Sequence, residues 1–221
     1  MKQNGATRNL AVTAIIASVI LGIVAVFAVV QAVNEADPAD ASSGPAQVLR
    51  SDSHRLDEAP DGRATLVEFL DFECEACGAA YPFIEDLRER YDGELTFVIR
   101  YLPLPGHANS RNAAHAVEAA ARQGKIEPMY QRMFQTQAEW GESRESKAPL
   151  FRSFAEDLGL DLQQYDRDVA SEAVANRVER DFQEATRLEV TGTPTFFLNG
   201  ERLQPQSDQD FYDSIDAALA G

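Results

Sequence analysis

The chain contains two cysteines, and they lie three positions apart in the motif Cys74-Glu75-Ala76-Cys77. A hydrophobic run over residues 65–72 ends just before the motif. Apolar residues then recur at helical spacing at Ala80, Phe83, Ile84 and Leu87. Two thiols on the first turn of a helix can close a short disulfide ring, and the positive end of the helix dipole favours a thiolate. The motif therefore favours dithiol–disulfide exchange.

The N-terminal part of the chain has the pattern of a membrane anchor. Residues 10–33 carry no charge and are rich in Ala, Val, Ile and Leu, and about 20 such residues span a bilayer. Basic residues precede this segment and acidic residues come after it, so we expect residues 1–9 in the cytoplasm and the rest of the chain outside. The alternative is a cleaved signal peptide, but its apolar core runs only about 7–15 residues. The length favours an uncleaved, single-pass anchor in the cell membrane.

Composition and charge limit the organisation and the partners of the remaining chain. Residues 34–47 are rich in Ala, Asp, Ser, Pro and Gly and are expected to form a flexible linker, and residues 48–221 suffice for one domain. The net charge of −16 makes nucleic acid an improbable partner, since phosphate binding needs a basic face. An outward location is oxidising, so a disulfide persists there. A ring this small adds little stability, so its chemistry is the better reason for it.

The order of elements predicts an α/β fold. A strand, a helix and a strand over residues 63–72, 74–91 and 94–102 form a parallel crossover unit. A block of helices comes next, and a β-hairpin with an Asn199-Gly200 turn and a closing helix end the chain. The predicted helices of the block cover residues 109–124, the stretch beginning near 128, and residues 148–158, 161–170 and 171–187. The hairpin strands are predicted at residues 195–198 and 201–203, and the closing helix at 207–220.

Three stretches of sequence resemble a known family. They are residues 67–77 (Val-Glu-Phe-Leu-Asp-Phe-Glu-Cys-Glu-Ala-Cys), residues 97–104 (Phe-Val-Ile-Arg-Tyr-Leu-Pro-Leu) and residues 190–196 (Val-Thr-Gly-Thr-Pro-Thr-Phe). Together they resemble the DsbA-like thiol:disulfide oxidoreductases, specifically the membrane-anchored extracytoplasmic kind. The resemblance covers residues 48–221. It implies a thioredoxin fold with an inserted all-helical subdomain at about residues 106–188, preceded by one N-terminal transmembrane helix.

The resemblance implies roles for the sulfurs and for one acid. Cys74 matches the exposed nucleophile and Cys77 the resolving thiol, with a Cys74–Cys77 disulfide in the oxidised state. Glu68 matches a buried acid beneath the disulfide, and its apolar neighbours favour burial over an exposed place on the strand. A buried carboxylate has a raised pKa and can exchange a proton with Cys77.

Substrate contacts are implied around the motif and at a second loop. Pro194 matches a cis-proline that faces the disulfide, and Thr193 before it would pair with an extended peptide through its backbone. Alternatively, Pro194 simply starts a strand. Glu75 and Ala76, between the cysteines, are expected to contact the substrate as well.

The implied activity is disulfide formation in reduced exported proteins, without a cofactor and with reoxidation by a quinone-linked membrane protein. We expect a monomer. Strong oxidants of this fold carry a histidine between the cysteines, whereas this chain has Glu75-Ala76 there and Asp71 and Glu73 nearby. Because like charges disfavour a thiolate, we predict a Cys74 pKa that is less depressed than in those oxidants.

Three other interpretations remain open. A zinc site needs about four ligands, and the chain offers two thiols and three scattered histidines, so no metal is expected. A membrane-tethered reductase or isomerase would use the same sulfurs in another direction. A non-enzymatic thioredoxin-like binding module would not need them.

His107 and His115 come after the second strand, and we expect them to cap or decorate a helix rather than to join the site.

Overall fold

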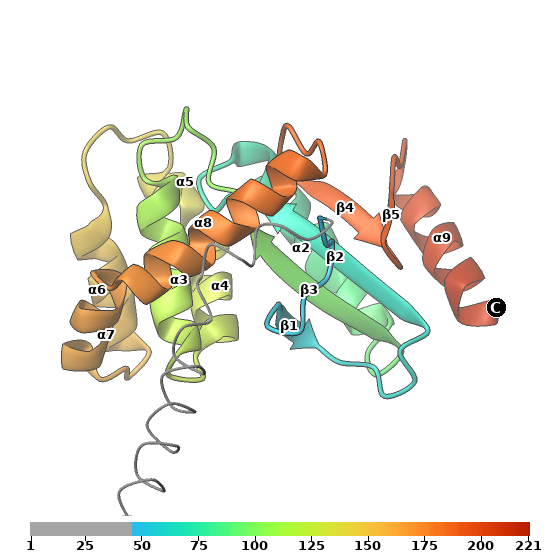
Figure 1. The fold of residues 1–221 in the computed structure, drawn as a ribbon, viewed down its shortest axis with the longest axis horizontal. Coiled ribbons are helices and arrows are strands. Elements are labelled where there is room, and N and C mark those ends of the chain that lie inside the picture. Colours follow the sequence, from blue (N-terminus) through green and yellow to red (C-terminus); the bar gives the residue numbers. More distant parts are fainter. Residues whose placement is uncertain (1–45) are drawn as a thin grey trace, which may run out of the picture. The chain divides into compact units, whose positions relative to one another are not determined.

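A five-stranded sheet lies at the centre of the computed structural model, which describes residues 46–221 (Figure 1). The strand order is β1-β3-β2-β4-β5. Only β2 and β3 pair in parallel, and the other neighbours are antiparallel. The strands are β1 (His54–Asp57), β2 (Ala64–Leu70), β3 (Leu95–Tyr101), β4 (Thr195–Leu198) and β5 (Glu201–Arg202). The two central strands are buried almost throughout, which explains their nearly continuous apolar sequence.

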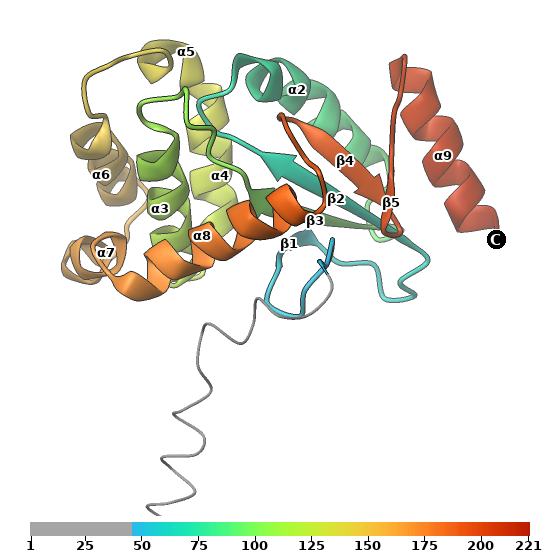
Figure 2. The ribbon, with the colours of Figure 1, turned by 45° about the horizontal axis from the view of Figure 1, so that its top comes forward.

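Helices cover both faces of this sheet (Figure 2). One hydrophobic cluster packs the sheet against the helix after β2 and against the closing helix, and continues into the helical block. A smaller cluster lies between the sheet and the helix before β4. The helices before the hairpin are α2 (Glu75–Arg90), α3 (Ser110–Ala121), α4 (Ile126–Gln135), α5 (Gln137–Trp140), α6 (Ala148–Asp157), α7 (Leu162–Val169) and α8 (Glu172–Arg187). The closing helix is α9 (Asp208–Ala220).

The predicted elements are confirmed apart from small shifts at their ends. Asp161 and Ser171, at which two of the predicted helices begin, cap α7 and α8, each accepting a hydrogen bond from a backbone N–H three residues on. Asn199 and Gly200 have φ angles of 51° and 86°, as a tight hairpin turn requires. The predicted insertion corresponds to helices α3–α8, between β3 and β4. Strand β1 and the short helix α5 were not predicted.

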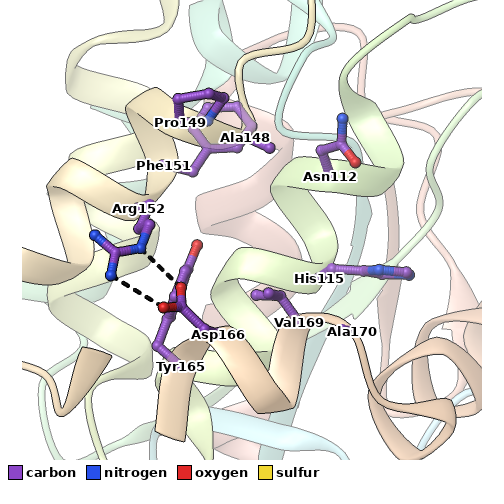
Figure 3. Close-up of a pocket in the computed structure, with 10 residues that line it drawn as sticks. All are labelled: Asn112, His115, Ala148, Pro149, Phe151, Arg152, Tyr165, Asp166, Val169 and Ala170. Carbon is purple, nitrogen blue, oxygen red and sulfur yellow. Dashed lines mark hydrogen bonds and ion pairs between the residues drawn. The ribbon is translucent and has the colours of Figure 1, made fainter. Parts of the chain in front are cut away.

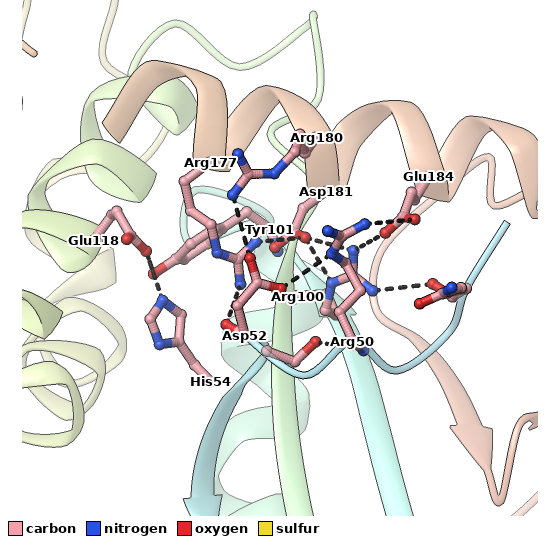
Figure 4. Close-up of polar contacts among 12 residues, drawn as sticks. Arg50, Asp52, His54, Arg100, Tyr101, Glu118, Arg177, Arg180, Asp181 and Glu184 are labelled. Atoms are coloured by element: carbon pink, nitrogen blue, oxygen red, sulfur yellow. Dashed lines mark hydrogen bonds and ion pairs between the residues drawn. The ribbon is translucent and has the colours of Figure 1, made fainter. Parts of the chain in front are cut away.

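A buried arginine on the sheet forms hydrogen bonds with the start of the domain and with α8 (Figure 4). The Arg100 side chain on β3 is fully buried, and its guanidinium donates to the carboxylates of Asp181 and Glu184. It also donates to the backbone carbonyls of Gln47 and Val48. These residues therefore belong to the folded unit, which runs from Ala46 to Gly221, slightly longer than the predicted 48–221.

The predicted cytoplasmic tail, anchor and most of the linker lie outside the described residues. Within residues 46–221, no helix combines the length and the apolar character needed to cross a bilayer. The single-pass anchor over residues 10–33 therefore stays a prediction.

Candidate active site

The two cysteines lie where the chain passes from strand β2 into helix α2. Cys74 is the N-cap residue of α2, in an extended conformation, and its backbone N–H donates to the carbonyl of Asp71 over 3.1 Å. Cys77 lies in the first turn. Both are free thiols in this structure, so the Cys74–Cys77 disulfide stays a prediction for the oxidised state.

The prediction of an exposed Cys74 was wrong. Cys74 retains only 7% of its accessible surface and Cys77 1%, so Cys74 is the more accessible of two buried thiols. Two later segments cover it. The carbonyl oxygen of Thr193 lies 3.4 Å from the Cys74 sulfur, and the Gln137 side-chain amide donates to the carbonyls of Phe72 and Cys74. Neither contact is visible in the local sequence around the motif.

The environment separates the two thiols chemically. A hydrogen bond from the Cys77 thiol lowers the pKa of Cys74 to about 5, with support from Thr193 and from the backbone N–H groups of Ala76 and Cys77, against the opposing effect of burial. Burial raises the pKa of Cys77 far above its ordinary value. The hydrogen bond that Cys77 donates to Cys74 and the negative charge of ionised Glu68 raise this pKa further. Near neutral pH the pair therefore holds one thiolate, on Cys74, and one proton, on Cys77.

The loop before β4 meets the motif from 119 positions further along the chain. The Thr193–Pro194 peptide bond is cis, as predicted. The Thr193 hydroxyl is buried and makes no hydrogen bond of ordinary geometry within the described residues, although it is close enough to favour the Cys74 thiolate. Glu75 and Ala76 are exposed between the cysteines. The surface around Cys74 is thus formed by the residues predicted to contact a substrate.

Glu68 is buried beneath the motif, as predicted. It lies in the middle of β2, paired with Ile99 of β3 and Phe196 of β4, and is only 2% exposed. Burial raises the pKa of Glu68 to about 8, and the negative charges of Glu85 and the Cys74 thiolate add to the shift. The carboxyl group is therefore protonated at neutral pH and can serve as a proton donor.

Asp71 and Glu73 are buried and hold a loop in place through hydrogen bonds. The Asp71 carboxylate accepts hydrogen bonds from the backbone N–H groups of Glu73 and Leu104, both over 2.9 Å. The Glu73 carboxylate accepts one from the N–H of Asn109. Both acids are 2% exposed, and they tie the turn before Cys74 to the loop after β3. Burial raises the pKa of Asp71, and its hydrogen bonds oppose that shift.

The two histidines after β3 have different positions. His107 lies against Asp71, with its Nδ1 2.6 Å from the carboxylate, so the expectation that it only decorates a helix was wrong. Its place in a loop of the sequence gave no signal of this contact. His115 lies on α3 and lines a separate cavity of about 440 Å³ between α3, α6 and α7, beside the ion pair of Arg152 with Asp166 (Figure 3). Within the described residues, no group of three or more His, Cys, Asp or Glu side chains is arranged to hold a metal ion.

Comparison with known proteins identifies the family. Residues 58–217 match the family model described as thioredoxin. The chain belongs to the thioredoxin family. A thioredoxin-like oxidoreductase from Silicibacter pomeroyi DSS-3 has 25% sequence identity and a TM-score of 0.66, covering 81% of this chain and 99% of that one. The structure of Wolbachia pipientis alpha-DsbA1 has 17% identity and a TM-score of 0.68, covering 78% and 93%. The fold is therefore the DsbA-like form of the thioredoxin fold.

Relatives with higher sequence identity are much longer proteins. The Na(+)/H(+) antiporter NhaA 1 of Mycobacterium sp. strain KMS is 39% identical over 148 residues, which is 65% of this thioredoxin-family chain and 23% of the antiporter. This chain thus spans less than a quarter of the length of such relatives. The sequence match covers only one part of each antiporter.

Proposed function

We propose that this protein is a thiol:disulfide oxidoreductase that forms disulfides in reduced exported proteins through Cys74 and Cys77. One observation carries the proposal: Cys74, with a pKa of about 5, caps a helix whose first turn holds Cys77, a buried thiol with a strongly raised pKa. Such a pair combines a ready nucleophile or leaving group with a thiol that keeps its proton.

In the oxidising direction, a client thiolate attacks the Cys74 sulfur of the disulfide. The Cys74–Cys77 bond breaks, a mixed disulfide forms, and Cys77 leaves with the electron pair as a thiolate. A second client thiolate then attacks the client sulfur of the mixed disulfide, and Cys74 leaves as a thiolate. Two electrons pass from the client dithiol to the enzyme, and the client keeps the new disulfide. The low pKa of Cys74 makes it a good leaving group in the second step.

Glu68 would supply the proton that Cys77 needs when it leaves. The carboxyl group is buried close enough to Cys77 that its ionised form raises the thiol pKa, and at neutral pH it carries a proton. Transfer of that proton to the Cys77 thiolate removes a buried negative charge from sulfur, where it is least stable. In the reducing direction the same carboxylate would take the proton from Cys77 as the thiol attacks.

The client peptide would lie across Thr193 and the exposed residues between the cysteines. The backbone of Thr193 lies directly over the Cys74 sulfur, where it can pair with an extended chain. Glu75 and Ala76 flank the same sulfur from the helix side. This arrangement presents a client cysteine to Cys74 without contacts that require a particular client sequence.

The location and the redox partner are part of the same proposal. The uncharged segment 10–33, with basic residues before it and acidic residues after it, supports a single-pass anchor with the domain on the extracytoplasmic side. An oxidising compartment there favours net disulfide formation, and the reduced enzyme would then need a quinone-linked membrane reoxidase. Alkaline phosphatase fused after Gly221 should be active in cells, whereas an inactive fusion would contradict this orientation.

The enzyme hypothesis is tested with the full-length chain. The oxidised protein should accelerate oxidative refolding of reduced ribonuclease, Cys74→Ser should abolish that activity, and Cys77→Ala should accumulate mixed disulfides with clients. Activity that survives Cys74→Ser would instead indicate a binding module. A protein that reactivates scrambled ribonuclease or reduces insulin, but does not oxidise reduced ribonuclease, would indicate the isomerase or reductase alternative.

A further inference from the structure

The active-site turn is joined to a histidine that lies outside the Cys-Glu-Ala-Cys motif. The Nδ1 atom of His107 is 2.6 Å from the carboxylate of Asp71, whose side chain is fully buried, while the His107 ring keeps a quarter of its surface exposed. Asp71 is three residues before Cys74, and its backbone carbonyl accepts the hydrogen bond of the Cys74 N–H. The histidine is therefore held rigidly beside the turn that carries the nucleophile.

Asp71 is well suited to hold a ring in one orientation. Its two carboxylate oxygens also accept hydrogen bonds from the backbone N–H groups of Glu73 and Leu104, so the group cannot rotate without losing them. The N–H of His107 itself donates to the carbonyl of Leu104 over 3.1 Å. Both the backbone and the ring of His107 are thus fixed with respect to the active-site turn.

His107 lines a cavity of about 310 Å³ together with both sequence neighbours of Cys74. Glu73 comes to this cavity from the turn, Glu75 from the start of α2, and Glu142 and Arg144 from the loop after α5. Arg144 is the positively charged side chain near the ring. The negatively charged groups around it are Asp71, Glu73, Glu75, Glu142 and the Cys74 thiolate. In such surroundings an imidazolium is favoured over a neutral imidazole.

The ionisation of His107 agrees with this arrangement. Burial tends to lower its pKa, but the hydrogen bond and the charge of Asp71, together with the charges of Cys74 and Glu73, outweigh that effect and raise it. The influence of Cys74 on His107 is reciprocal, because two groups that interact electrostatically shift each other's ionisation by the same free energy.

We propose that His107 is a positioning residue for Cys74. Asp71 holds the His107 ring, and the ring places a positive charge near the nucleophile from the loop after β3. The proposal deepens the function given above and rests on Cys74 being the nucleophile. Carboxylates line the Cys74 side of the cavity and would oppose a negative sulfur. A cation brought from another element of the fold offsets them and stabilises the reduced enzyme.

The decisive measurement is the thiolate absorbance titration of Cys74 in the reduced full-length chain. His107→Gln can keep a hydrogen bond to Asp71 but has no charge, and it should raise the Cys74 pKa by about 0.5–1 unit. The equilibrium with glutathione should shift about three- to tenfold toward the disulfide form, and tenfold corresponds to about 30 mV. His107→Lys should restore most of the shift. Equal Cys74 pKa values in wild type and His107→Gln would overturn the proposal.

A matched control is available in the same molecule. His54 forms the same kind of pair, with its Nε2 2.6 Å from the Glu118 carboxylate and its ring similarly exposed, but on β1. His54→Gln should leave the Cys74 pKa unchanged. If both variants shift it equally, the effect is a general response to losing a histidine–carboxylate pair, and the proposal fails.

A measurement without any substitution covers the case in which the variants do not fold. The pKa of His107, followed by NMR of its ring proton, should be higher in the reduced protein than in the disulfide form, by the same 0.5–1 unit, because the thiolate is present only when Cys74 is reduced. The same His107 pKa in both redox forms would refute the proposal. Both titrations are independent of turnover, so a protein that fails to oxidise ribonuclease would contradict the proposed function without affecting these results.

Discussion

Replacing the buried Glu68 by glutamine should stabilise the reduced protein at neutral and alkaline pH. Burial raises the pKa of Glu68 from 4.5 to about 8, so the folded state holds this proton more tightly than the unfolded chain. The stabilising contribution of the proton is present in full below about pH 4.5 and is lost as the pH rises through about 8. Glutamine does not ionise, and its contribution stays constant over that range.

The size of the effect is calculated from the shift. At 1.36 kcal/mol per pKa unit, about 3.5 units correspond to about 5 kcal/mol once Glu68 is ionised in both states. Between pH 5 and pH 9 the wild-type protein should therefore lose about 4 kcal/mol of unfolding free energy relative to Glu68→Gln. Other titrating groups are common to both proteins, so the difference between the two curves isolates this residue.

Urea unfolding of the reduced chain at pH 5, 7 and 9 measures the difference. Glu201→Gln, at an exposed position on β5, is the matched control and should follow the wild-type curve. Parallel curves for wild type and Glu68→Gln would show that Glu68 does not hold a proton in the folded state, and its role as proton donor to Cys77 would be rejected with it. If that role is correct, Glu68→Gln also slows stopped-flow thiol exchange by at least tenfold at pH 7.

Three further outcomes are expected. The rate of Cys74 alkylation by iodoacetamide should rise with pH around a midpoint near 5, because the hydrogen bond from Cys77 stabilises the Cys74 thiolate, and a midpoint near 8.5 would contradict this. Gly78→Ala places a methyl group 1.9 Å from the Gln137 side-chain oxygen and should destabilise the fold by about 1–2 kcal/mol. In a Gln137→Ala background the same substitution should stabilise the fold by up to about 1 kcal/mol, because alanine is favoured over glycine in helices. Arg100→Met removes a partner from two buried carboxylates and should reduce the unfolding free energy by about 3 kcal/mol or more in the same urea experiment. Arg111→Met removes an exposed ion pair and should change the unfolding free energy by less than about 1 kcal/mol.

The elements that the sequence predicted well are those with strong local signals. Strand β4 coincides with the predicted residues 195–198 because an apolar run ends at an Asn-Gly turn. Strand β1 was missed because its four residues, His54–Asp57, are half-buried and mostly polar, so they show neither an apolar run nor an alternation. Its place in the sheet comes from antiparallel pairing with β3, which is a tertiary contact.

The site was predictable to the extent that its residues carry their own signals. The cysteine pair, the acid inside an apolar strand and the proline before β4 are each visible as a local pattern. Contacts between distant segments were not visible, and these decide how accessible Cys74 is. Gln137 lies on a four-residue helix without a periodic pattern, yet its amide binds the carbonyl groups at the start of α2.

Four acids lie close to the cysteines in the sequence, and the structure gives them different roles. Glu68 is buried without its charge and can act as an acid, whereas Asp71 and Glu73 are buried as hydrogen-bond acceptors that hold a loop. Of the four, Glu75 alone is exposed. If all four acted as solvated charges beside the sulfur, they would oppose a thiolate at Cys74. Glu68 carries no charge at neutral pH, and the hydrogen bond from Cys77 has the largest effect on Cys74, so the Cys74 pKa falls to about 5 in a strongly acidic protein.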